Sequence, residues 1–214
     1  MTRLILLRHG ESEANRAGLF AGWSDYPLTP LGHAQAESAA KYIAGNYHIA
    51  CAYTSDLLRA SQTGEHVSTR FGLPLVREKG LREIYAGEWE GKSFDALCAN
   101  YGEAYRTFRE DIGNAHCTGG ESFTELQARV VATVQRIAAE HPGQDILIAT
   151  HATVVRALVC FMRGIAPSEA HGLPWVPNAS VSVAERDGRG TWSVPVYGYH
   201  AYLRDLATEV PPNV

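Results

Sequence analysis

The sequence predicts an α/β fold, a three-layer sandwich in which helices flank both faces of a mostly parallel central sheet. Short apolar runs, which are typical of strands buried on both faces, alternate with segments whose apolar residues recur at helical spacing. This alternation is the pattern of a parallel sheet covered by helices. We expect one domain over residues 1–214, because no repeat, linker or low-complexity segment interrupts the pattern.

The first part of the chain contains three predicted strands and two predicted helices. Thr29 is a cap for the first helix and Pro30 takes its first position, while the second helix starts at Ser55 or Asp56 and stops at Gly72. In chain order the predicted elements are a strand at 3–7, a helix at 30–45, a strand at 49–54, a helix at 56–72 and a strand at 73–76.

The rest of the chain begins with a segment of weaker periodicity, residues 84–118, which is rich in aromatic residues and glycine. We interpret this segment as an insertion over the sheet edge. Pro142 and Gly143 end the helix that follows it. The remaining predicted elements are a helix at 121–141, a strand at 145–150, a helix at 152–164 and strands at 179–185 and 192–200, before a frayed tail after Asp205.

The charge of the chain excludes partners that bind through a basic surface. With a formal net charge of -4 and a pI near 6.1, we expect neither a nucleic acid nor a membrane as a partner. The N-terminal apolar run is too short for a signal peptide. Four cysteines spaced far apart suit reduced thiols better than a disulfide framework, which favours a cytoplasmic protein.

Basic side chains follow three of the predicted strands. Arg8 and His9 come after the first strand, Arg59 lies in the first turn of the helix after the second, and His151 directly follows the strand at 145–150. Ligands bind where the carboxyl ends of parallel strands meet helix N-termini. Each residue alone has a structural explanation, but together they predict a site for a phosphate-like anion, with arginine providing forked donors.

Two further residues are candidates for this site. Asn15, a few residues past His9, offers an amide donor, although it could be an ordinary loop residue. Glu83 follows the strand at 73–76 and is either a catalytic acid or an exposed carboxylate beside Arg82.

A set of motifs in one order resembles the histidine phosphatase superfamily, in its phosphoglycerate-mutase-like branch. The motifs are RHGESEAN, GWSDYPLTPLGHAQA, YTSDLLRASQT, LREIYAGEWEG, GGESFTELQARV and ATHATVVRAL, and they cover roughly residues 3–185. The resemblance implies that His9 is a nucleophile that becomes a phosphohistidine and that Glu83 is the general acid. It implies that His151 is a further catalytic residue in contact with the phosphoryl group. The remaining phosphate-binding positions fall on Arg8, Asn15, Arg59 and the backbone amides of Ala21 and Gly22.

The chain departs from the family pattern at two positions. Ala152 stands where the family usually has glycine after the second histidine, and its backbone N–H should remain available. Ala21 stands where a polar side chain is common, so one contact at the pocket rim is missing. The resemblance implies a broad-specificity phosphatase that hydrolyses small phosphomonoesters, with the insertion at 84–118 over the active site.

The residue types are sufficient for phosphoryl transfer without a metal or another cofactor. Charge builds on the equatorial oxygens in the transition state, and two arginines and an amide can stabilise it. The chain has no D-x-D or H-E-x-x-H sequence for metal-assisted chemistry. Nearby Arg8 and Arg59 should keep His9 neutral, which a nucleophilic imidazole requires.

Three alternatives are weighed against a phosphatase. A phosphoglycerate mutase shares RHGES, but its family members carry a longer insertion with extra basic residues, where this chain offers only Arg106 and Arg109. A non-catalytic protein that binds phosphorylated ligands would be favoured by loss of His9 or Glu83, and both are present. A nucleotide-binding enzyme is suggested by GEWEGKS, which ends in Gly-Lys-Ser like a P-loop. The spacing does not fit, because Ala86 stands where a P-loop needs glycine. The oligomeric state stays open, a homodimer included.

Overall fold

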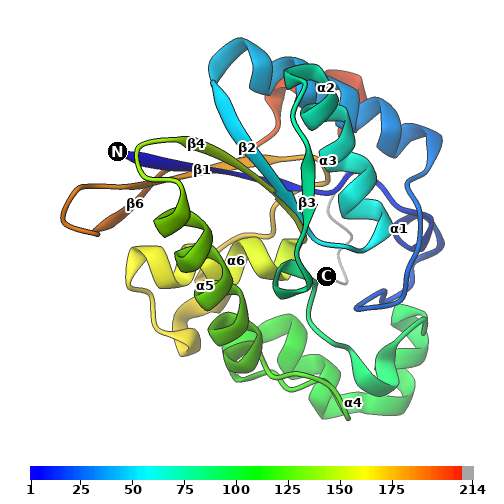
Figure 1. The fold of residues 1–214 in the computed structure, drawn as a ribbon. Coiled ribbons are helices and arrows are strands. Elements are labelled where there is room, and N and C mark those ends of the chain that lie inside the picture. Colours follow the sequence, from blue (N-terminus) through cyan, green and yellow to red (C-terminus); the bar gives the residue numbers. More distant parts are fainter. Residues whose placement is uncertain (209–214) are drawn as a thin grey trace.

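A computed structural model of the chain describes residues 1–208 and confirms the predicted α/β class (Figure 1). Its sheet has six strands in the order β3-β2-β4-β1-β5-β6. Strands β1 to β4 pair parallel with one another, whereas β5 pairs antiparallel with β1 and β6 pairs antiparallel with β5. The bounds are β1 Thr2–Arg8, β2 Ile49–Thr54, β3 Leu75–Arg77, β4 Asp145–Thr150, β5 Val181–Arg186 and β6 Trp192–Tyr199.

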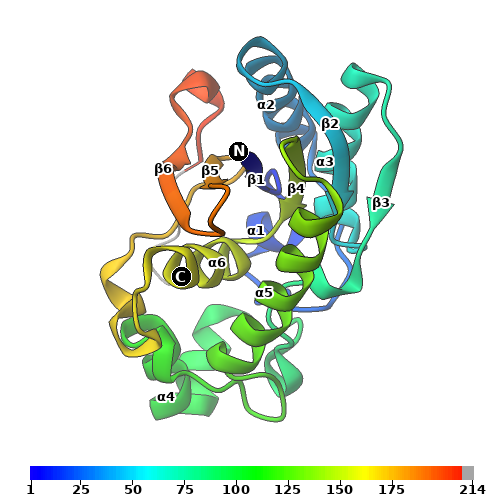
Figure 2. The same ribbon diagram turned by 60° about the vertical axis from the view of Figure 1, so that its left-hand side comes forward.

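Helices cover both faces of the sheet, which lies between them in Figure 2. On one face, α2 (Pro30–Asn46) and α3 (Leu58–Phe71) pack against a buried cluster that includes Ile5 and Leu7 of β1. On the other, α5 (Phe123–Glu140) and α6 (Ala152–Arg163) pack against Leu4 and Leu6. The four residues from Leu4 to Leu7 are all fully buried although they face opposite layers in turn, so this part of β1 has to be apolar.

Two helices were not predicted. The first, α1 (Glu13–Ala17), is only five residues long, and its N-terminus is capped by Ser12 in a capping box with Asn15. The second, α4 (Phe94–Glu110), lies inside the segment 84–118 and is interrupted at Gly102, where φ is 28°. The kink breaks the apolar periodicity, which explains why the sequence pattern was weak there.

The aromatic residues of the segment 84–118 pack mainly on one another. Trp89 is fully buried and makes edge-to-face contacts with Phe20, Tyr105 and Phe108 at centroid distances of 5.6, 5.7 and 5.8 Å. Figure 2 shows α4 beyond one end of α5 and α6, away from the sheet. These residues therefore form a small core of their own, joined to the larger apolar cluster on the α5 and α6 face.

The predicted start of α3 was wrong in its capping residues. The helix begins at Leu58, and Leu57 occupies the cap position without a side-chain cap. Asp56 instead accepts two hydrogen bonds of 2.6 Å from Arg82, while Ser55 is buried and bonds to His151. The predicted tail after Asp205 lies partly outside the described residues.

All four cysteines are free thiols, Cys51, Cys98, Cys117 and Cys160. Across residues 1–208, no helix has the length and apolar character required to span a membrane.

Candidate active site

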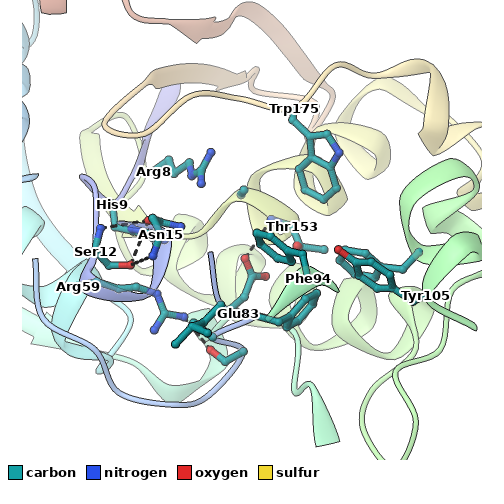
Figure 3. Close-up of a pocket in the computed structure, with 16 residues that line it drawn as sticks. Arg8, His9, Ser12, Asn15, Arg59, Glu83, Phe94, Tyr105, Thr153 and Trp175 are labelled. Carbon is teal, nitrogen blue, oxygen red and sulfur yellow. Dashed lines mark hydrogen bonds between the residues drawn. The ribbon is translucent and has the colours of Figure 1, made fainter. Parts of the chain in front are cut away.

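The carboxyl ends of β1, β2 and β4 bring the predicted basic residues together at one pocket (Figure 3). The pocket holds about 650 Å³ of space, part of it open to solvent. Seven of the eight predicted site residues line it: Arg8, His9, Asn15, Ala21, Gly22, Arg59 and Glu83. The eighth, His151, is fully buried and does not reach the pocket wall; its ring packs edge-on against His9, with centroids 5.3 Å apart.

The ring of His9 is oriented by the backbone of the next residue. Nδ1 lies 2.7 Å from the carbonyl oxygen of Gly10, so it carries the proton and donates it to that oxygen. Nε2 is left with its lone pair. Gly10 is required at this turn because a Cβ there would lie 2.4 Å from the carbonyl oxygen of Gly32. The end of β1 thus combines a basic pair with the residue that lets α2 approach closely.

Burial and two guanidinium groups keep His9 neutral. Burial lowers its pKa well below the ordinary value, and the positive charges of Arg59 and Arg8 lower it further. The same causes, in which burial is the largest, lower the pKa of His151. A neutral imidazole with a free Nε2 is the form that can attack phosphorus.

His151 is held by a hydrogen bond with Ser55, the residue that directly follows β2. Its Nε2 lies 2.9 Å from the Oγ of Ser55, and its buried Nδ1 has no hydrogen-bond partner among the described residues. The predicted contact with a phosphoryl group therefore stays a prediction. What the structure provides is a packed support behind the ring of His9.

Arg8 and Arg59 are both buried and are both held by backbone carbonyl groups. Arg8 donates to the carbonyl oxygen of Val176, and its Nε has no partner within the described chain. Burial is the main reason that the pKa of Arg8 falls to about 10, at which the group is still charged at neutral pH. Arg59 donates to the carbonyl oxygens of Gly22 and Ser24 at 2.7 and 2.9 Å.

Asn15 presents its amide nitrogen to the pocket because its oxygen is already used. Oδ1 accepts hydrogen bonds from the backbone N–H and the hydroxyl of Ser12, at 3.1 and 3.0 Å, and from Nδ2 of Asn178 at 3.2 Å. No acceptor for its own Nδ2 lies among the described residues. The capping box of α1 therefore aims a donor at any anion beside His9.

The loop at residues 21–24 is arranged around one carboxylate. Glu90 accepts hydrogen bonds from the backbone N–H groups of Trp23, Ser24 and Ala86, at 2.7, 2.8 and 3.1 Å. A Cβ at Gly22, where φ is 44°, would lie 2.3 Å from Glu90 Oε1. The loop leaves the backbone N–H groups of residues 21 and 22 without an acceptor among the described residues, as an anion site requires.

Glu83 lies between the basic end of the pocket and its aromatic end (Figure 3). Its two oxygens accept hydrogen bonds from the backbone N–H groups of Ile84, at 2.8 Å, and Thr153, at 3.3 Å. Burial raises its pKa above the ordinary value, although Arg59 opposes the shift. The carboxyl group can therefore hold a proton closer to neutral pH than a free glutamate does.

The segment that carries Glu83 is clamped by one arginine. Arg129 of α5 donates to the carbonyl oxygens of Gly80, Arg82 and Glu83 at 3.1, 3.0 and 3.1 Å. It also forms a paired contact with Glu121 at 2.8 and 2.7 Å. A single side chain thus holds the irregular backbone that places Glu83 at the pocket.

The sequence prediction missed several residues that build the site. These residues are Ser55, Glu90, Arg129 and Asn178. Each holds another residue of the site through a hydrogen bond that joins positions 46 to 169 residues apart in the sequence. Only Glu90 had a local signal, as part of the GEWEG motif. Trp175, which lines the pocket, comes from an irregular segment before β5 that carried no periodic pattern.

The described residues contain no cluster of three or more histidine, cysteine, aspartate or glutamate side chains suited to a metal ion. The donors that converge on the pocket are two guanidinium groups, one amide and two backbone N–H groups. This set fits a tetrahedral oxyanion.

Comparison with known proteins gives a consistent result. A family model described as "Histidine phosphatase superfamily (branch 1)" matches residues 4–198. A 2,3-bisphosphoglycerate-dependent phosphoglycerate mutase of Methylobacterium radiotolerans is 35% identical over 86% of this chain and 93% of its own. The structure of Bacillus stearothermophilus YhfR superposes with a TM-score of 0.90 at 32% identity, covering 95% of this chain and all of that one. A mycobacterial glucosyl-3-phosphoglycerate phosphatase superposes with a TM-score of 0.85 at 28% identity, covering 92% of this chain and 98% of its own.

Proposed function

The chain belongs to the histidine phosphatase superfamily, and from that premise we propose that it hydrolyses small phosphomonoesters through a phosphohistidine formed on His9. The similar proteins are named as phosphatases or mutases, so the chain is an enzyme. The observation that carries the proposal is the state of His9: neutral, with Nδ1 bonded to the backbone and Nε2 free, between two guanidinium groups. The four free cysteines favour the cytoplasm as its location.

In the first step of the proposed reaction, Nε2 of His9 attacks phosphorus and the bond from phosphorus to the leaving oxygen breaks. Arg8, Arg59 and Asn15 stabilise the negative charge on the equatorial oxygens. The backbone N–H groups of residues 21 and 22 add two further donors. Glu83 gives its proton to the leaving oxygen, so an alcohol is released and the carboxylate remains.

In the second step, the Glu83 carboxylate takes a proton from a water molecule, whose oxygen attacks phosphorus. The bond from phosphorus to Nε2 breaks, inorganic phosphate is released, and His9 and Glu83 return to their starting states. One group serves as acid and then as base because its pKa is raised toward the working pH. All the required proton transfers are made by side chains of the chain itself.

The alternative is a phosphoglycerate mutase, which is favoured by the names of similar proteins. A mutase must grip a second acidic group on its substrate. Among the described residues that line the pocket, only Arg8 and Arg59 are cationic, and in the proposed reaction both bind the transferred phosphoryl group. Arg106 is exposed and paired with Glu103, and Arg109 lies on the exposed face of α4. We therefore place the phosphatase first.

The experiment is a phosphate-release assay on a panel of phosphomonoesters in the presence of EDTA. We expect turnover by the wild type and its loss in His9→Ala, with wild-type activity in His171→Ala, a matched loss of an exposed histidine. Rapid interconversion of 2- and 3-phosphoglycerate stimulated by 2,3-bisphosphoglycerate would select the mutase. Wild-type turnover by His9→Ala would exclude the phosphohistidine.

A further inference from the structure

The pocket has two ends of different chemistry, and the proposed acid stands between them. Arg8, His9 and Arg59 form one end, and Phe94, Tyr105 and Trp175 form the other, with Glu83 and Thr153 in the middle (Figure 3). An acid that protonates the leaving oxygen must lie beside it. The rest of the leaving group then extends past Glu83, toward the aromatic end.

Among the described residues that line the aromatic end, none is cationic; Arg109 of α4 acts electrostatically on the Tyr105 phenol but does not line the pocket. Among the described residues lining that side, the side chains are apolar or aromatic, with Tyr105 as the one phenol. Arg156 is close but not available: its guanidinium stacks on Trp175 at 4.0 Å from the ring centroid and donates to the carbonyl oxygen of Leu173. A carboxylate or second phosphate placed here would lose its hydration without gaining a counter-charge, and it would lie near Glu83.

The aromatic wall is held in place before any ligand arrives. Trp175 is packed between Arg156 on one face and the stacked ring of Phe108, with ring centroids 6.2 Å apart. Phe108 in turn stacks on Tyr105 at 6.4 Å with an interplanar angle of 8°. Trp175 and Phe94 are both partly exposed, whereas Tyr105 and Phe108 are buried behind them. A preformed aromatic surface binds a planar group with little loss of side-chain entropy.

We propose that the preferred substrates are phosphomonoesters of uncharged alcohols that carry a planar aromatic group, and that Trp175 and Phe94 set this preference. The inference rests on the proposed phosphatase function and adds the class of leaving group to it. It assigns to Trp175, which lies far from the phosphate-binding residues in sequence, a role in specificity rather than in the chemistry of phosphoryl transfer.

The test compares three esters of primary alcohols, so that the acidity of the leaving alcohol is nearly constant. These are 3-phenylpropyl phosphate, n-propyl phosphate and the phosphate ester of 4-hydroxybutanoate. We expect kcat/KM for the phenylpropyl ester to exceed that for the propyl ester by on the order of tenfold or more, from the apolar area buried. The carboxylate ester should be no better than the propyl ester.

Variants at Trp175 test whether this residue sets the preference for the phenylpropyl ester. Trp175→Ala should reduce the ratio of phenylpropyl to propyl kcat/KM by roughly tenfold, and Trp175→Phe should restore most of it. Trp192→Ala, a matched loss of a partly buried tryptophan on β6, should leave the ratio unchanged. A ratio that Trp175→Ala does not alter, or a preference for the carboxylate ester, would overturn the inference while leaving the phosphatase intact. Failure to release phosphate from any ester, p-nitrophenyl phosphate included, would overturn the proposed function and the substrate class with it.

Discussion

Replacing Glu83 by glutamine separates proton donation from every other task of this residue. The carboxyl group accepts hydrogen bonds from the backbone N–H groups of Ile84 and Thr153. Glutamine has one acceptor oxygen, which suits the shorter contact with Ile84 at 2.8 Å. Its amide nitrogen would then oppose the N–H of Thr153, at a cost of about 1 to 3 kcal/mol. This cost is local and weakens catalysis equally for all substrates.

Removing the proton donor should slow the reaction by different factors for different substrates. A general acid contributes about 10²- to 10⁴-fold, and an alkoxide needs that proton whereas a nitrophenolate leaves without much help. We therefore expect Glu83→Gln to lose on the order of a hundredfold or more with an alkyl phosphate and clearly less with p-nitrophenyl phosphate. The ratio of the two losses cancels the positional cost and isolates proton transfer.

The assay is single-turnover phosphorylation in a rapid-quench instrument, with Glu88→Gln as a control for an exposed carboxylate in the same segment. Because the proposed second step also uses Glu83 to activate water, the aryl substrate should give a burst of nitrophenolate followed by slow turnover. Equal losses on both substrates would mean that Glu83 only positions the substrate and that another group delivers the proton.

Three further predictions concern stability and positioning. Folding lowers the pKa of His9 below its unfolded value, so the unfolded state binds more protons and the free energy of unfolding falls as pH drops below about 6.5. In His9→Gln this contribution is absent, so below that pH the free energy of unfolding should fall with pH less steeply than in the wild type, by about 1.4 kcal/mol per pH unit. Urea titrations at several pH values measure this difference. Glu90→Gln frees the loop at 21–24, so KM should rise by roughly tenfold or more with a smaller change in kcat. Trp89→Ala removes a fully buried indole and should lower the free energy of unfolding by about 3 to 5 kcal/mol, measured by urea denaturation.

The parts of the fold that follow from local patterns were predicted well. The strands at 49–54 and 145–150 have the bounds that the apolar runs indicated, because the buried middle of each strand is apolar and turn or polar residues flank it. Helix α6 was predicted equally well, since it begins directly after the end of β4. Helix α4 was missed because Gly102 breaks its period, and α1 because five residues span little more than one turn.

The candidate site was predictable where one residue follows one strand. Arg8, His9 and Arg59 could be placed at a common edge because parallel strands end together. The residues that hold them could not be placed, because a hydrogen bond such as that from Asn178 to the carbonyl oxygen of His9 joins positions 169 residues apart. For the same reason Asp56 was assigned to a helix cap, when its partner is Arg82.

The central claim is that the phosphoryl group is transferred to His9, and trapping the phosphorylated intermediate tests it most directly. Glu83→Gln should be mixed with p-nitrophenyl phosphate, quenched in base, where a phosphohistidine survives, and digested for mass spectrometry. We predict close to one phosphoryl group per chain, located on the peptide of β1 at His9 and absent when His9→Ala is added. A burst of nitrophenolate with no phosphoenzyme, or a phosphoryl group located on His151 instead, would contradict the account.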